Sequence, residues 1–215
     1  MILYLDTSSS VLYCALYRDG EVFAYLKEPL SKDLSKDALS LISEMFRKCD
    51  VSVTDISKII VVNGPGSFTG IRIGLTISKI FAWSKKIDVI PISSIEAMAY
   101  SLEGEANYVV PLIDAKHGFV YSSIYDNLNN SFIMNEKYIS LDTLLVTLDS
   151  IDGKVVFITN DTFDGIGNTI KYSPNFLNII EKTKNRSSVN VHSLDANYLK
   201  RTEAEENLDD KRSNS

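Results

Sequence analysis

The 215-residue sequence contains only two cysteines and two histidines, and it has no run of about 18 apolar residues. Cys14 and Cys49 lack C-x-x-C spacing, which predicts reduced thiols rather than a disulfide. The absence of a long apolar run and of a basic N-terminal region argues against a membrane span and a signal peptide. We therefore expect a cytoplasmic protein without a membrane partner.

Residues with the spacing of a metal site are also absent. His117 and His192 are far apart in the sequence and show no ligand-like spacing. Asp33 and Asp37 are one helical turn apart, but the lysines beside them are more typical of a solvated helix face. The sequence thus predicts no metal site.

The sequence has too few basic residues for a protein that binds nucleic acid on its own. The formal charge is −6 and the pI is near 5.0. Because binding to a phosphate backbone needs clustered lysine and arginine, any RNA would have to be held mainly by another protein. The hydrophobic content of 45% is sufficient for a packed core. The polar residues 203–215 predict a disordered tail.

What the sequence does contain is a glycine-rich turn between an apolar strand and a long apolar helix. The turn lacks the lysine of a P-loop, and its G-x-G-x-x-x-G spacing is one residue too long for a dinucleotide fingerprint. Amides at the helix start could hold an anion, although Pro65 removes one of them. A structural turn and an anion site both stay open. The motif residues are Gly64, Pro65, Gly66, Ser67, Phe68, Thr69, Gly70 and Arg72.

Apolar periodicity and turn signals predict one strand and helix pattern that occurs twice. The first copy has strands at 2–6, 11–17 and 21–26, a helix from about 33, a strand at 59–62 and a helix after 70. The second has strands at 108–114, 119–125 and 132–138, a helix at 141–148 and a strand at 155–159. Asp6 and Asp114 end matching strands, and the correspondence weakens after Asp161. We interpret the chain as duplicated β-β-β-α-β-α units with a reduced second lobe.

This α/β layout resembles the two-lobed actin, sugar-kinase and Hsp70 (ASKHA) architecture, in which a nucleotide lies between the lobes. We expect an N-terminal lobe with partner-binding helices over 1–103, a smaller lobe over 104–202 and the tail. The chain also resembles the TsaB family, called YeaZ as well. The segments that carry this resemblance are Asp6-Thr7-Ser8, Gly64–Gly74, Ile113-Asp114-Ala115, Val120-Tyr121 and Tyr198–Arg201. The family commonly has arginine and glutamate where this chain has Lys116 and Phe119, so this hairpin departs from the family pattern.

The resemblance implies a catalytically inactive scaffold in tRNA threonylcarbamoyladenosine modification. The expected main partner is a TsaD-like enzyme, which transfers the threonylcarbamoyl group to adenosine 37 of tRNA. A TsaE-like ATPase joins the assembly, and tRNA is contacted only through it. A homodimer is expected when TsaD is absent. We expect no tightly bound cofactor in this chain alone, with ATP and metal in the partner subunits. The TsaD His-x-x-x-His pair has no counterpart in residues 31–37.

The alternatives are a small-molecule kinase and a peptidase of the same superfamily. The second lobe lacks a recognisable adenosine-binding motif, since Gly165-Ile166-Gly167 is too brief, and Asp114 is followed by a hairpin sequence. Ser67 does not lie in a G-x-S-x-G elbow. The sequence leaves the distance between Ser67 and His117 open.

The helix after Gly70 is apolar around most of its circumference, so packing on one sheet would leave an apolar side exposed. Small residues recur on it at Gly70, Gly74, Ser78 and Ala82, and they would allow a partner helix, or the helix near 33–48, to approach closely. Gly74→Arg should then block dimerisation and leave the monomer folded. Arg72 is placed to pair with an acidic partner or with the second lobe. The predicted interface residues are Leu34, Ala38, Leu41, Ile71, Gly74, Leu75, Ser78 and Ala82.

Overall fold

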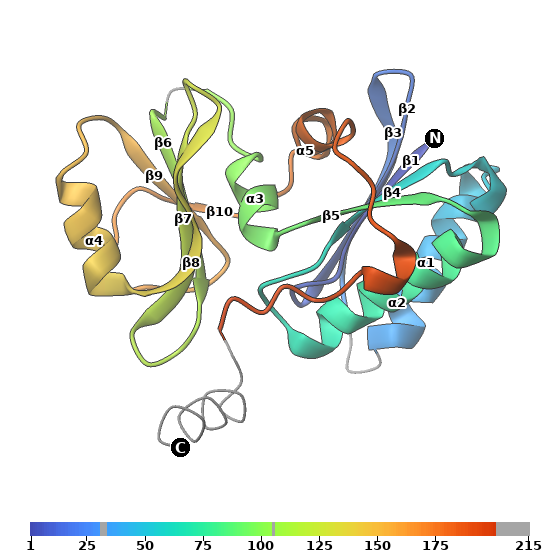
Figure 1. The fold of residues 1–215 in the computed structure, drawn as a ribbon, viewed down its shortest axis with the longest axis horizontal. Helices are drawn as coiled ribbons and strands as arrows, with labels where there is room; N and C mark the ends of the chain where they lie inside the picture. The colour runs from blue at the N-terminus through green and yellow to red at the C-terminus, as the bar shows by residue number, and fades with distance from the viewer. Residues whose placement is uncertain (31–33, 105, 201–215) are drawn as a thin grey trace, which may run out of the picture.

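A computed structural model describes residues 1–30, 34–104 and 106–200, which form two five-stranded sheets with helices between and outside them (Figure 1). The first sheet has the strand order β3-β2-β1-β4-β5 and the second the order β10-β9-β6-β7-β8. None of the helices in the described ranges is long and apolar enough to cross a membrane. The tail predicted for residues 203–215 lies outside the described residues.

The first lobe is built on β1 (Ile2–Asp6), β2 (Val11–Arg18), β3 (Glu21–Pro29), β4 (Lys58–Val62) and β5 (Asp88–Ile92). The second is built on β6 (Tyr108–Asp114), β7 (Phe119–Asp126), β8 (Ser131–Ser140), β9 (Val155–Thr159) and β10 (Thr169–Lys171). The helices are α1 (Leu34–Lys48), α2 (Phe68–Lys85), α3 (Ser94–Ala99), α4 (Leu141–Asp149) and α5 (Phe176–Thr183), with short 3-10 turns η1 (Val53–Asp55) and η2 (Val191–Ser193).

The predicted duplication is confirmed by the pairing of the strands. In each sheet the first three strands pair in antiparallel fashion, and the first strand also pairs in parallel with the fourth. A parallel fifth strand completes each sheet. The second lobe is reduced as expected, because the loop 160–168 stands where the first lobe has α2. The sequence prediction missed β5, α3, β10 and α5, which are short or lie where the repeat weakens.

The lobes are joined by a shared hydrophobic core. Helices α1 and α2 cover one face of the first sheet, and α4 covers the outer face of the second (Figure 1). Between the sheets, α3 and α5 pack with Tyr4 and Ile60 from the first lobe and Val109 and Ile158 from the second. Burial of apolar surface between the sheets therefore stabilises their relative position.

The chain finally returns from the second sheet to the first. Helix α5 packs on β2 and β3, although the prediction assigned residues 104–202 to the second lobe. We call residues 189–200 the C-terminal strap. It starts at β5, where the Val189 amide donates to the Val89 carbonyl, at 2.8 Å. Figure 1 shows the strap passing α2 and ending near β8.

Candidate functional site

In the turn after β1, the buried carboxylate of Asp6 accepts hydrogen bonds from within the turn. One oxygen of Asp6 accepts hydrogen bonds from the amide of Ser8, at 2.8 Å, and from its hydroxyl, at 2.7 Å. Burial raises the pKa of Asp6 to about 6, although both bonds from Ser8 act to lower it. With 2% of its surface exposed, Asp6 does not reach the space between the lobes.

The glycines of the motif let α2 approach this turn closely. The Thr7 hydroxyl donates to the Gly70 carbonyl at 2.7 Å. A Cβ atom on Gly70 would lie 2.0 Å from the Thr7 carbonyl oxygen, and one on Gly74 would lie 2.5 Å from the Thr7 hydroxyl. Gly70 and Gly74, two members of the stripe of small residues, therefore face the turn after β1. Neither a partner helix nor α1 occupies Gly70 and Gly74.

Ser67 begins α2 as its N-cap. Its hydroxyl accepts the Gly70 amide at 3.2 Å, and its own amide donates to the Ser8 carbonyl at 2.7 Å. Gly64 and Pro65 are buried at the end of β4. His117 lies in the exposed turn between β6 and β7, and no histidine of the described residues lines the space beside Ser67. This arrangement gives Ser67 a capping role and no base, which disfavours the peptidase alternative.

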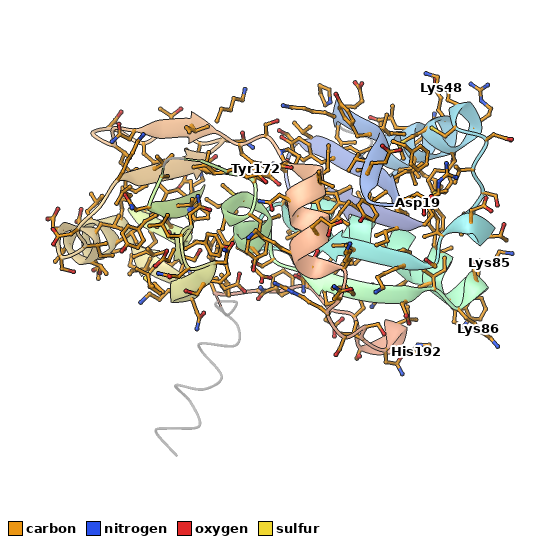
Figure 2. The ribbon with its side chains drawn as sticks, turned by 90° about the horizontal axis from the view of Figure 1, so that it is seen from above. Asp19, Lys48, Lys85, Lys86, Tyr172 and His192 are labelled. Carbon is orange, nitrogen blue, oxygen red and sulfur yellow. The ribbon has the colours of Figure 1, made fainter. Side chains whose placement is uncertain are left out.

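A cavity of about 590 Å³ lies between the lobes, at the ends of β1, β6 and β9. Figure 2 shows Tyr172 in this region between the sheets. Asp114 forms an ion pair with Lys116, and hydrogen bonds from Lys116 hold the pKa of Asp114 below its ordinary value. The cavity wall also includes residues of the turn after β1, of β3, of the motif and of the second lobe. They include Ser8, Ser9, Ser10, Lys27, Gly66, Ser67, Asn160, Asp161 and Lys171.

The charges on this cavity wall are nearly balanced, with Lys27 and Lys171 against Asp114 and Asp161. Lys27 also donates to the Ser173 hydroxyl at 3.1 Å, and Asp161 accepts the Asp114 amide at 2.8 Å. Within the described ranges, histidine, cysteine and carboxylate side chains nowhere gather in a group of three or more that could hold a metal ion.

The outward side of α2 carries an apolar groove of about 450 Å³. Phe68, Ile80 and Trp83 are exposed to 53%, 58% and 73%. Large apolar side chains that share an exposed face usually mark an interaction surface. The groove is lined by Leu39 of α1 and by Phe68, Thr69, Arg72, Ile73, Thr76, Ile77 and Ile80 of α2. We call these residues and Trp83 the docking face.

The residues predicted for the interface lie mostly on the other side of these helices. Leu41 is partly buried, and the side chain of Leu34 lies outside the described residues. The buried side chains expose little surface to a partner in the folded monomer. The buried members are Ala38, Ile71, Gly74, Leu75, Ser78 and Ala82.

The expectation that Gly74→Arg leaves the monomer folded is contradicted, because any side chain there meets Thr7. The all-round apolar character of α2 predicted that a second face, besides the one on the sheet, would be covered. It could not show which face meets the sheet, so Phe68, Ile80 and Trp83 were missed as the exposed set.

Comparisons with known proteins find relatives in tRNA threonylcarbamoyladenosine biosynthesis. Residues 28–154 match the TsaD family, described as tRNA N6-adenosine threonylcarbamoyltransferase. The chain is 32% identical to the tRNA threonylcarbamoyladenosine biosynthesis protein TsaB of Bacillus subtilis, across 95% of this chain and 96% of that protein.

Two solved structures share the fold. YeaZ from Pseudomonas aeruginosa superimposes with a TM-score of 0.72 at 19% identity, covering 92% of this chain and 99% of that one. A second structure is described as an uncharacterised protein from the same species with similarity to peptidase YeaZ. It superimposes with a TM-score of 0.76 at 18% identity, covering 93% of this chain and 99% of that one. The chain therefore has the same fold as these two structures. Together with the relative from B. subtilis, these findings show that the chain belongs to the TsaB (YeaZ) family of tRNA threonylcarbamoyladenosine biosynthesis proteins.

Proposed function

We propose that this protein is a scaffold that binds a TsaD-like catalytic subunit through its docking face and supports threonylcarbamoyl transfer to adenosine 37 of tRNA. The observation that carries the proposal is the apolar groove on α2, where Phe68 and Ile80 are more than half exposed. An exposed apolar face costs solvation free energy unless a partner covers it.

The choice of partner is supported by the match of residues 28–154 to the TsaD family, because that range contains α1 and α2. Two subunits with the same helix pair can pack face to face about a pseudo-twofold axis, as identical subunits do about a true one. The same reasoning supports a homodimer through this face when the catalytic subunit is absent. In the full assembly a TsaE-like ATPase joins, tRNA is contacted through the complex, and the location is cytoplasmic.

We infer that the chain is catalytically inactive alone and holds no nucleotide tightly, with ATP and metal bound by its partners. Asp6, which ends β1 where an ASKHA kinase places its metal, is turned into the protein by Ser8. Asp114 is paired with Lys116. Calorimetry with ATP and Mg²⁺ tests this, and a dissociation constant in the low micromolar range would contradict it.

The scaffold proposal is tested by light scattering after gel filtration, for this protein alone and mixed with the TsaD-like subunit of its own organism. We expect a homodimer that exchanges into a one-to-one heterodimer. Ile80→Glu should abolish both, because it places a charge in the apolar groove. Val146→Glu is a matched control, since Val146 is 69% exposed on α4 of the other lobe. A wild-type protein that never associates with its folded partner would overturn the proposal.

A further inference from the structure

The one arginine of the docking face is held in place by two aromatic rings. The guanidinium carbon of Arg72 lies 3.9 Å from the ring centroid of Phe68. Its Nε donates to the hydroxyl of Tyr198, at 3.4 Å, and the rings of Phe68 and Tyr198 stack with their centroids 5.8 Å apart. Contact of a guanidinium with an aromatic face restricts a side chain that would otherwise be mobile.

Tyr198 reaches this place because the C-terminal strap is fixed to both lobes. The Asn197 amide donates to the Asn63 carbonyl at 2.7 Å, at the end of β4. Its side-chain amide donates to Glu136 of β8 at 2.8 Å. The arginine clamp, formed by Phe68, Arg72 and Tyr198, therefore combines a helix of the first lobe with a strap that spans both.

The clamp leaves the end of the guanidinium unused. Within residues 1–30, 34–104 and 106–200, the terminal nitrogens of Arg72 have neither a hydrogen-bond acceptor nor an ion-pair partner. Two parallel N–H groups are the donors that a carboxylate accepts in bidentate fashion. Because the clamp already restricts the side chain, little conformational entropy is left to lose when a ligand binds.

The surroundings of Arg72 favour a protein carboxylate over nucleic acid. The groove beside it is lined by Ile73, Ile77 and Ile80. The neighbouring Lys79 already faces Asp195, at 3.8 Å. A phosphate backbone needs several cations in a row, whereas one arginine inside an apolar groove matches one acidic side chain on an otherwise apolar surface.

We propose that the arginine clamp is the specificity contact of the docking face and receives an aspartate or glutamate of the TsaD-like subunit. This inference rests on the proposed function, since it assumes the same partner on the same face. Docking removes water from the guanidinium and the carboxylate together, which makes the geometry of the pair decisive. Arginine is also enriched among the residues that dominate binding energy at interfaces.

The test is calorimetric titration of the TsaD-like subunit with variants of the full chain. Arg72→Gln should weaken binding at least about 30-fold, as for an interface residue that dominates affinity. Arg72→Lys keeps the charge but loses the planar fork, and should weaken binding about tenfold. Tyr198→Phe keeps the stacking and removes only the hydroxyl, so about threefold is expected. Binding by wild type should weaken with added salt, and Arg72→Gln should remove most of this dependence.

Arg18→Gln is the matched control. The guanidinium carbon of Arg18 also lies over a phenylalanine, 5.0 Å from the ring of Phe23, but on the β2–β3 hairpin outside the groove. It should bind like wild type, and all variants should unfold at the wild-type temperature. If wild type binds and Arg72→Gln binds within twofold of it, the clamp proposal is wrong and the scaffold proposal stands. If wild type itself does not bind, the scaffold proposal fails as well.

Discussion

The two lobes share one strand order, yet they treat the aspartate at the end of the first strand in opposite ways. Asp6 is buried, and burial raises its pKa to about 6. Asp114, at the matching place, pairs with Lys116 in a partly open turn, and its pKa is lowered. At the same topological position, burial thus dominates the pKa of Asp6, whereas hydrogen bonds from Lys116 dominate that of Asp114.

The 18-residue helix α2, which has no counterpart in the described second lobe, covers the turn after β1. Asp6 itself interacts with Tyr4, Tyr13 and Tyr172. One side of α2 receives Thr7 on Gly70 and Gly74. The opposite side exposes Phe68 and Ile80. In the first lobe, helix α2 therefore both closes over the turn after β1 and presents an apolar surface.

Among the variants that test this difference between the lobes, Gly70→Ala should have the largest effect. The new methyl group would lie 2.0 Å from the backbone oxygen of Thr7, so the helix or the turn must move. We expect a loss of ~3 kcal/mol in the free energy of unfolding, at the upper end for overpacking. Denaturation in urea measures it.

Gly167→Ala provides the control, because Gly167 lies in the loop that replaces α2 and an added Cβ meets nothing within 4 Å. Its free energy of unfolding should stay within about 0.5 kcal/mol of wild type. Equal losses for both variants would mean that the turn after β1 does not depend on close approach of α2.

Much of the fold could be predicted from the sequence, because its strands alternate or form β-branched runs and its turns carry strong signals. Asp19-Gly20 predicted the first hairpin, and residues 2–6, 108–114 and 155–159 were predicted with the bounds that the structure has. Helix α5 was missed, since its eight residues follow the point where the repeat fades. Tertiary contact with β2 and β3, which local patterns do not encode, defines it.

The site was less predictable for a similar reason. The spacing of Gly70 and Gly74 correctly indicated close approach, but spacing does not name the group that approaches. That group is Thr7, more than sixty positions away. The strap gave no periodic signal at all, so the contact of Tyr198 with Phe68 could not be anticipated, although Tyr198 belonged to the segments that carried the family resemblance.

The opposite titration of the two aspartates predicts opposite pH dependence. Since the folded-state pKa of Asp6 is raised, the folded protein holds a proton that the unfolded chain releases, and stability falls as the pH rises from about 4 to 7. Asp6→Asn should remove about 3 kcal/mol of this decline, because 1.36 kcal/mol corresponds to one pKa unit. The Asn oxygen can still accept from Ser8.

Asp114→Asn should act in the other direction. Because the pKa of Asp114 is lowered in the folded protein, its ionised form adds stability at neutral pH, and this stability is lost as the carboxylate becomes protonated at low pH. The variant should therefore be slightly less stable than wild type at pH 7 and equally stable near pH 2. Urea denaturation of both variants at several pH values measures the two slopes. If the free energy of unfolding changed with pH equally in wild type and in Asp6→Asn, the raised pKa of Asp6 in the folded protein would be contradicted.

A smaller loss than for Gly70→Ala is expected where the strap joins the lobes. Asn197→Ala removes the hydrogen bond to Glu136, whose other carboxylate oxygen is buried without a partner among the described residues. We expect a loss of about 1 to 2 kcal/mol at pH 7.5. Burial raises the pKa of Glu136, and the Asn197 amide opposes that rise by favouring the ionised form.

Without the Asn197 amide, Glu136 should therefore protonate more readily, and the loss should shrink toward pH 5. Asn63→Ala, which removes an exposed bond from the Asn63 amide to the Asp195 carbonyl, should lose less than Asn197→Ala and show no change with pH. Hydrogen exchange of β8 and of the strap would separate the two variants, since only Asn197→Ala should speed exchange on the second lobe. A loss for Asn197→Ala that does not change with pH would mean that its bond to Glu136 does not hold the lobes together.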